Sequence, residues 1–188
     1  MDGMKSQDIV VLLKLASLQD QEDQTSPEAF RADSPYAVRN LEALLGISKT
    51  EINASIKRSL SSGLAVKDRD TGRPKTNRQA LVNLLIHGLK FVFPAEPGAM
   101  TRGVPTAFAA PMLKGLLISG SNYIYVWPSA EGRDMGQSVQ PLFKTVPQAV
   151  QKDDALYEYL ALADAIRLGN PREAGLAGSR LSERLLKR

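Results

Sequence analysis

The sequence predicts a mainly α-helical protein that carries one small β ribbon. Three observations support this fold class. Apolar residues recur three and four positions apart in several segments, as they do on one face of a helix. A glycine and serine break separates two such segments between Leu41 and Leu64. A short alternating segment then turns at Asp70, Thr71 and Gly72, which is typical of two paired strands.

Composition limits the class of protein. The 188 residues suffice for one domain, or for one small domain with an appendage, and 43% of them are hydrophobic. The chain has no cysteine, which excludes disulfides and cysteine-based metal sites. No apolar run approaches the roughly 20 residues of a membrane span, and Met1 to Gln7 lacks the pattern of a signal peptide. We therefore expect a cytoplasmic protein with no membrane partner.

The first helix is expected from Ser6 to Leu18. The polar segment Gln19 to Pro35 contains two prolines, so we expect a loop there with a single turn after Pro27. A second helix is expected from Tyr36 to Leu45, because its apolar residues fall on one face at helical spacing: Val38, Leu41, Leu44 and Leu45.

A tight turn and a third helix follow. Gly46 ends the second helix, since glycine readily takes the left-handed conformation found after a last turn. Ser48 and Glu51 form a capping-box pattern at the start of a helix from Lys49 to Ser61. Its spacing predicts an apolar packing face made of Ile52, Ile56 and Leu60. The other side is polar and basic, with Thr50, Ala54 and Lys57 pointing away and Asn53 and Arg58 at the flanks.

Leu64 to Asn77 is predicted to form the two-stranded ribbon, with a charged tip. Asn77 is placed to cap a fourth, amphipathic helix, whose apolar stripe consists of Leu81, Leu84, Leu85, Gly88 and Leu89. His87, the single histidine, falls off this stripe. We therefore expect a surface residue there, with no metal and no nucleophile.

The composition changes after Phe91, which gives two expected domains, 1–90 and 91–188. Four prolines and two glycines lie among the eighteen residues from Pro94 to Pro111, and they predict a loop-rich region without regular elements. Within it, Thr101 to Pro111 fits either an apolar docking surface or an ordered loop packed over the core, which is the interpretation that we favour.

The rest of the C-terminal half contains one β-prone run and two helices. Tyr123 to Pro128 carries alternating aromatic residues, for which core packing is favoured over stacking on single-stranded nucleic acid: Tyr123, Tyr125 and Trp127. One helix is expected to begin near Asp153 or Asp154, where capping explains both acids without catalysis. The last helix begins at Pro171, a favoured residue for a first turn.

The net charge of +4 is distributed unevenly. Residues 1–48 contain 4 basic and 8 acidic side chains, a net charge of −4. Residues 49–78 contain 8 basic and 3 acidic side chains, a net charge of +5. Such clustering of positive charge is typical of a site for a polyanion, and here it coincides with the third helix and the ribbon.

This order of helix, helix, tight turn, helix and basic ribbon resembles the winged helix-turn-helix domain of bacterial transcriptional regulators, broadly the MarR-like type. The residues that carry the resemblance are LEALLGISKTEINASIKRSLSSGLAVKDRDTGRPKTN, and it extends over about residues 5–90. In that family the helix after the turn enters the major groove, and the wing lies along the backbone or the minor groove. The resemblance implies a winged helix-turn-helix N-terminal domain with a small β-wing, followed by a loop-rich, helix-ending C-terminal region.

The resemblance also assigns DNA-binding roles. The positions that match the recognition helix are Ser48, Lys49, Thr50, Asn53, Ala54 and Lys57, and those that match the wing are Arg69, Arg73 and Lys75. The basic residues Lys57, Arg58, Arg69, Arg73 and Lys75 are expected to neutralise phosphates. Many such helices carry an arginine or glutamine where this one has Ala54. We therefore expect Asn53 to recognise a base edge, with a methyl contact from Thr50 or Ala54.

Three classes of function follow from these observations. The first is a sequence-specific regulator of transcription that binds double-stranded DNA, more often a repressor than an activator, and acts as a homodimer. The alternative is an antitoxin or adaptor protein whose C-terminal half binds a partner protein while the winged helix is autoregulatory or vestigial. An enzyme is not expected, because the sequence shows no paired acid and base, no metal ligands and no activated nucleophile. No cofactor is expected either.

The expected homodimer has a predicted contact. The two C-terminal helices carry apolar stripes that the proline-rich region offers little core to cover. We therefore expect Leu160, Leu181 and Leu185 to lie near a dimer interface. The competing arrangement folds the same helices back as core of one monomer.

Overall fold

The computed structural model describes residues 3–25, 34–116 and 123–187, and the predicted turn after Pro27 lies outside them. The chain is mainly helical with two small sheets, as the sequence predicts. It forms two compact units, Met1–Leu81 and Val82–Arg188. The division falls inside helix α4 (Arg78–His87) and not after residue 90. Among the described residues, none of the helices combines the length and the apolar character that a membrane crossing requires.

Helix α1 of the first unit spans Ser6–Asp23, five residues beyond the predicted end at Leu18. Asp8 to Leu18 are buried without interruption, so the helix has no exposed face over three turns. Its last turns are polar and carry the acids Asp20 and Glu22, whose partners on other elements are described below. The polar composition after Leu18 therefore marks the exposed end of a helix and not the loop that we expected.

Helices α2 (Val38–Leu45) and α3 (Lys49–Ser61) are joined by the predicted tight turn. Gly46 has φ +66°, the left-handed conformation that favours glycine. The Ser48 side chain accepts a hydrogen bond from the Glu51 backbone N–H at 3.4 Å, so it caps α3, but only this half of the predicted capping box is formed. The Glu51 side chain contacts Lys5 and Gln7 near the start of α1.

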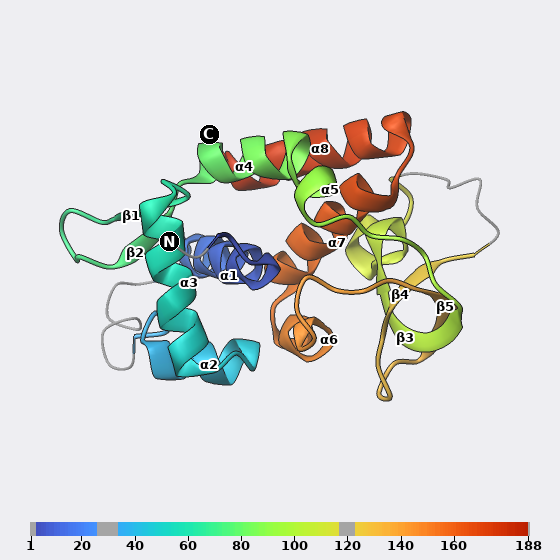
Figure 1. Cartoon of the computed structure of the whole chain (residues 1–188), viewed down its shortest axis with the longest axis horizontal. Coiled ribbons are helices and arrows are strands. Elements are labelled where there is room, and N and C mark those ends of the chain that lie inside the picture. Colours follow the sequence, from blue (N-terminus) through green and yellow to red (C-terminus); the bar gives the residue numbers. More distant parts are fainter. Residues whose placement is uncertain (1–2, 26–33, 117–122, 188) are drawn as a thin grey trace. The chain divides into compact units, whose positions relative to one another are not determined.

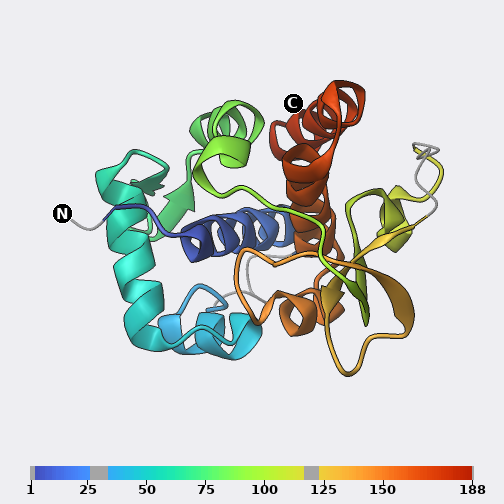
Figure 2. The ribbon, with the colours of Figure 1, turned by 45° about the vertical axis from the view of Figure 1, so that its right-hand side comes forward.

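The packing face of α3 differs from the prediction. Ile52, Ser55 and Ser59 are buried, whereas Ile56 and Leu60 are only half-buried. The helix contacts both α1 and α2, and it crosses α1 steeply in two views (Figures 1 and 2). Serine side chains are small, so they let the helix axes approach more closely than a row of isoleucine and leucine would. The apolar spacing thus identified the helix but not its buried side.

The ribbon is present as strands β1 (Ala65–Lys67) and β2 (Pro74–Thr76), paired antiparallel with Val66 opposite Lys75. The buried Thr76 hydroxyl donates to the Leu12 carbonyl of α1 at 2.7 Å, which anchors the ribbon to that helix. Asn77 then accepts a hydrogen bond from the Ala80 backbone N–H at 3.2 Å and so caps α4, as predicted.

The second unit contains a small sheet that the sequence analysis missed. Strands β3 (Met100–Thr106), β4 (Tyr125–Pro128) and β5 (Asp134–Ser138) form a closed three-stranded barrel in which β3 pairs with both neighbours. A Cβ atom at Gly103 would collide with the Trp127 backbone, so this residue permits the close approach of the strands. Two of the residues that predicted an irregular loop, Gly103 and Pro105, therefore belong to a strand.

The second unit also contains short helical segments. They are α5 (Leu89–Val92), the 3₁₀ turns η1 (Ala107–Ala109) and η2 (Pro111–Leu113), α6 (Val146–Ala149) and the 3₁₀ turn η3 (Val150–Lys152). Thr101 to Pro111 is thus ordered, although as strand and 3₁₀ turn and not as a loop. Of the three aromatic residues in the β4 region only Trp127 is fully buried, while Tyr123 is exposed and Tyr125 half-buried.

Helices α7 (Asp154–Leu168) and α8 (Pro171–Leu185) end the chain and lie side by side (Figure 2). Asp153 caps α7 and Asn170 caps α8 through side-chain hydrogen bonds. Leu160, Leu181 and Leu185 are at most 1% exposed. The prediction that these leucines lie at a dimer interface is therefore wrong, because the chain itself covers them.

Candidate nucleic-acid interface

The exposed side of α3 is polar and basic. Lys49, Thr50, Asn53 and Lys57 are all exposed, and residues four apart lie on the same face, so Lys49, Asn53 and Lys57 form a row along the helix. Ala54, the remaining predicted reader, is half-buried. Ser48 precedes the row, with its hydroxyl engaged by the helix cap. The local reason for this arrangement is the burial of Ile52, Ser55 and Ser59 on the opposite side.

Two contacts of Lys49 are with α2. Its ammonium lies 3.7 Å from a Glu42 carboxylate oxygen, and its backbone N–H donates to Glu42 at 3.3 Å. Both side chains are exposed, where such ion pairs contribute little to stability. Lys49 can therefore exchange this partner for another anion at small cost.

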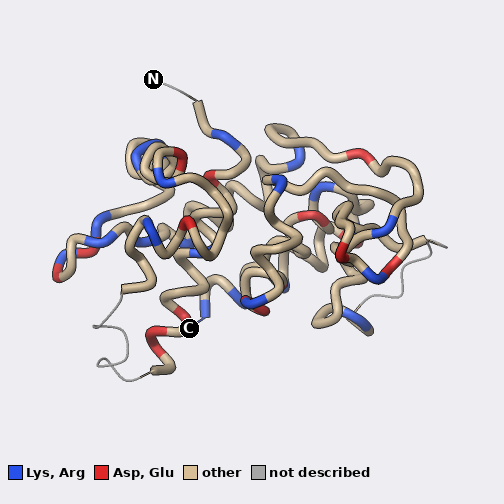
Figure 3. Tube along the Cα trace, turned by 90° about the horizontal axis from the view of Figure 1, so that it is seen from below, with Lys and Arg blue, Asp and Glu red and all other residues tan. Residues whose placement is uncertain are grey.

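The ribbon adds a second group of exposed cations. Lys67 lies on β1, Arg69 in the turn and Lys75 on β2, and all three are exposed. Figure 3 shows where Lys and Arg (blue) and Asp and Glu (red) lie along the trace of the chain. The turn itself is built on Asp68, whose Oδ1 accepts hydrogen bonds from the Asp70 and Thr71 backbone N–H groups and from the Thr71 hydroxyl. These hydrogen bonds, first that of the Thr71 N–H, lower the pKa of Asp68 below its ordinary value. The ionised carboxylate thus fixes the shape of the tip.

Arg58 is not part of this surface. Its guanidinium donates two hydrogen bonds to the Asp8 carboxylate, at 2.9 Å from Nε and 2.7 Å from the terminal nitrogen. The Arg58 side chain is 10% exposed and that of Asp8 is 1% exposed. This two-point pair joins α3 to the start of α1, so the predicted phosphate contact at Arg58 is replaced by a structural ion pair.

Arg73 is also engaged within the first unit. Its guanidinium lies 3.4 Å from a Glu22 oxygen and 5.2 Å from the centre of the Tyr36 ring, a cation–π distance. The Tyr36 hydroxyl donates to the same Glu22 carboxylate at 2.8 Å. Burial and this hydrogen bond raise the pKa of Tyr36 above its ordinary value. Arg73 therefore holds the end of α1 against the ribbon, whereas we predicted a wing residue that contacts phosphate.

A third arginine, Arg78, also pairs with an acidic residue of α1. Arg78 donates to the Asp20 carboxylate at 2.9 Å and to the Ala16 carbonyl at 3.0 Å. Three of the eight basic residues in 49–78 thus pair with the acidic residues of α1. The opposite charges of the two segments are explained in part by their attraction to each other within the folded unit.

Five of the eight basic residues in 49–78 remain exposed, and they lie on one helix face and on the ribbon. They are Lys49, Lys57, Lys67, Arg69 and Lys75, accompanied by the polar side chains Thr50 and Asn53. We call these seven residues the α3–ribbon surface. Lys67 was not among the predicted site residues, and strand alternation would have placed it on the same face as buried Ala65.

The second unit holds a buried acidic group outside this surface. Asp164 of α7 is 1% exposed and accepts hydrogen bonds from the Thr106 hydroxyl at 2.7 Å and the Trp127 indole N–H at 2.6 Å. Arg167 lies 3.5 Å away and donates to the Gln140 carbonyl at 2.8 Å. Burial raises the pKa of Asp164, and its arginine partner and two donors oppose that shift. The group ties α7 to β3 and β4.

The remaining groups considered as candidates are the single histidine and possible metal ligands. His87 is exposed at the end of α4, as expected. Within the described ranges, no three His, Asp or Glu side chains gather closely enough to hold a metal ion.

Comparisons with protein-family models, with curated proteins and with solved structures found no match to this chain.

Proposed function

We propose that the chain is a DNA-binding regulator of transcription, with the first unit acting as a winged helix-turn-helix domain of the MarR-like type. The observation that carries the proposal is the α3–ribbon surface: a capped helix after a tight turn exposes Lys49, Asn53 and Lys57 in one row, and a ribbon with further cations follows it in the same unit. In this proposal α3 enters the major groove and the ribbon lies along the backbone. The protein acts in the cytoplasm without catalysing a reaction.

The contacts divide into two kinds. Lys57, Lys67, Arg69 and Lys75 neutralise phosphates and fix the register, which gives affinity without sequence preference. Asn53 reads a base edge through its amide, and Thr50 offers a methyl group and a hydroxyl beside it. Arg58 and Arg73 have no place in this set, because they hold α3 and the ribbon on α1.

Two copies are required for useful specificity, because one helix reads too few base pairs. We therefore propose a homodimer that acts as a repressor by occupying a near-palindromic site. Its contact surface excludes the buried leucines of α7 and α8 and must use exposed residues.

A partner-binding role is the second candidate. It is favoured by one observation on the second unit: Phe91 is 80% exposed and the adjacent Val92 53% exposed, which is unusual for large apolar side chains. In that case the chain is an antitoxin or adaptor, and the first unit is autoregulatory or vestigial. Stable co-elution with one defined protein that is lost in Phe91→Ser would favour it.

Selection of bound fragments from random DNA and from the protein's own promoter region tests the first proposal. The purified chain should enrich a near-palindromic motif. Asn53→Ala should relax base preference at one position of each half-site, at a cost of about 1–3 kcal/mol. Lys57→Ala should weaken binding to all sequences alike, and Lys144→Ala, which removes an exposed lysine of the second unit, serves as the matched control. Failure to enrich any motif contradicts sequence-specific regulation.

A further inference from the structure

A small cavity lies wholly within the second unit, and the DNA-binding proposal makes no use of it. Its volume is about 120 Å³, and its walls come from η1, the β4 region, α7 and the start of α8. The lining is mostly apolar and aromatic, with Phe108, Tyr125 and Leu168 among the largest side chains. Cavities of about 150 Å³ accommodate benzene. The space therefore suits one ring-sized or branched apolar group.

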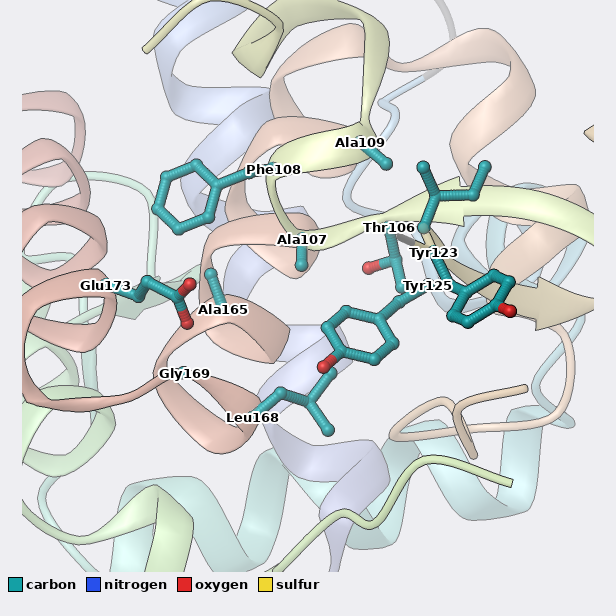
Figure 4. A pocket seen from close by; sticks show the side chains of 11 residues that line it. Thr106, Ala107, Phe108, Ala109, Tyr123, Tyr125, Ala165, Leu168, Gly169 and Glu173 are labelled. Carbon is teal, nitrogen blue, oxygen red and sulfur yellow. The ribbon is translucent and has the colours of Figure 1, made fainter. Parts of the chain in front are cut away.

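Glu173 is the single charged residue among those that line the cavity. Its Oε2 accepts the Asn170 backbone N–H at 3.1 Å as part of the cap of α8, which holds the carboxylate in place. Among the described residues no hydrogen bond reaches its Oε1. Figure 4 shows Phe108, Tyr125 and Glu173 extending from three different elements toward the same space.

This combination selects one class of ligand. The faces of aromatic rings attract cations, and a carboxylate beside them adds an ion pair and a charge-assisted hydrogen bond. An anionic ligand would be repelled, and a neutral one would leave the negative charge of the carboxylate without a counter-charge. We propose that the cavity binds a small primary amine with an aromatic or branched apolar body, whose ammonium group pairs with Glu173.

The backbone beside the cavity supplies an independent observation. Ala107 has φ +51°, the only positive φ at a non-glycine residue in the part of the chain that the structure describes. Strained conformations of this kind persist where the surroundings hold them, and they concentrate at ligand sites. Here the preceding residue, Thr106, is held by its hydrogen bond to buried Asp164. The wall of the cavity is thus fixed before any ligand arrives.

Binding is tested on the full chain with ¹³C-methyl labels on alanine and isoleucine, titrated with benzylamine, benzyl alcohol or benzoate. Benzylamine should shift the methyl signals of Ala107, Ala109, Ala165 and Ile124, which line the cavity. It should bind about tenfold or more tightly than benzyl alcohol, because both can donate a hydrogen bond to the carboxylate but only the ammonium group adds an ion pair. Benzoate should bind more weakly than either.

Glu173→Gln provides the matched variant, since glutamine at this position preserves a capping box while removing the charge. It should reduce the affinity for benzylamine about tenfold and that for benzyl alcohol much less, because the alcohol can also donate to the glutamine oxygen and loses no ion pair. Glu183→Gln, on an exposed position of the same helix, should change neither. Equal affinities of the wild-type chain for amine and alcohol would overturn the proposal, as would methyl shifts confined to residues outside the cavity. The wild-type comparison does not depend on how the variant folds.

Discussion

Neighbouring residues on α3 have opposite roles, and a sequence pattern alone does not separate them. Lys57 and Arg58 are adjacent and both positive, yet Lys57 is exposed and Arg58 is paired with buried Asp8. The difference arises because residues one apart on a helix point about 100° away from each other. Only the position of α1 reveals which of the two faces an acid.

A pair of substitutions tests this division. Arg58→Ala should lower the free energy of unfolding of the first unit by about 3–5 kcal/mol, because it leaves the Asp8 carboxylate buried without its cation. Lys57→Ala should change it by less than about 0.5 kcal/mol, since the side chain is exposed. Denaturant unfolding followed by circular dichroism measures both values. Equal, small effects would mean that the Arg58–Asp8 pair contributes nothing.

The buried acid of the second unit gives a second prediction at this scale. Asp164→Asn removes the charge opposite Arg167, which is itself 3% exposed, and should destabilise the unit by about 3–5 kcal/mol. Thr106→Val removes one neutral donor to the same carboxylate and should cost about 1–3 kcal/mol. Thermal and denaturant unfolding with Trp127 fluorescence follows this unit, since the chain has one tryptophan. A larger loss of unfolding free energy for Thr106→Val than for Asp164→Asn would contradict the greater importance assigned to the charge.

Among the elements, helix α8 differs most from the prediction, which placed two of its leucines at a dimer interface. α8 carries both buried and exposed leucines, and the buried ones face the interior of the chain. Leu181→Ala should cost about 2–5 kcal/mol, because this side chain is 0% exposed and its loss leaves a cavity. Leu176→Ala on the same helix should cost less, about 1 kcal/mol, since Leu176 is 37% exposed and buries less apolar surface. Sedimentation should give the same association state for both variants. Dissociation of an oligomer by Leu181→Ala alone would restore α8 as a subunit contact.

The elements also show how far the sequence could predict the structure. α3 was predicted from Lys49 to Ser61 as observed, because Ser48 caps its start and Gly63 follows its end. The end of α1 was missed, because its polar turns are held by contacts of Asp20 and Glu22 with residues 58 and 51 positions away. The composition of the segment itself does not indicate which distant residues its acids will contact.

β3 was missed for a related reason. Glycine and proline usually interrupt strands, but Gly103 is needed where this barrel closes tightly, and Pro105 lies within the same strand. The exposed residues of the candidate surface were predicted better, since periodicity alone orients Thr50 and Lys57. The cavity beside Glu173 could not be predicted, because it joins four segments that only the folded chain brings together.

For the whole molecule, the uneven charge has two consequences. Part of the positive excess in residues 49–78 is neutralised by the acids of α1 through Arg58, Arg73 and Arg78. The part that remains exposed is concentrated on α3 and the ribbon, the two elements that would contact DNA. Of the eight basic residues in 49–78, only five are therefore exposed to a polyanion partner, and all five lie in the first unit.

The salt dependence of DNA binding tests the central claim most directly. Fluorescence anisotropy of a labelled duplex should be measured between about 50 and 200 mM salt for the wild-type chain, for a double variant, Lys57→Ala with Lys67→Ala, and for Lys144→Ala as control. With four phosphate contacts in each of two copies, affinity should fall about 10³-fold or more over this range. The double variant should bind more weakly with a shallower slope, and the control should match the wild type. Binding that stays constant across the salt range, or a slope unchanged in the double variant, would contradict a DNA interface on the α3–ribbon surface.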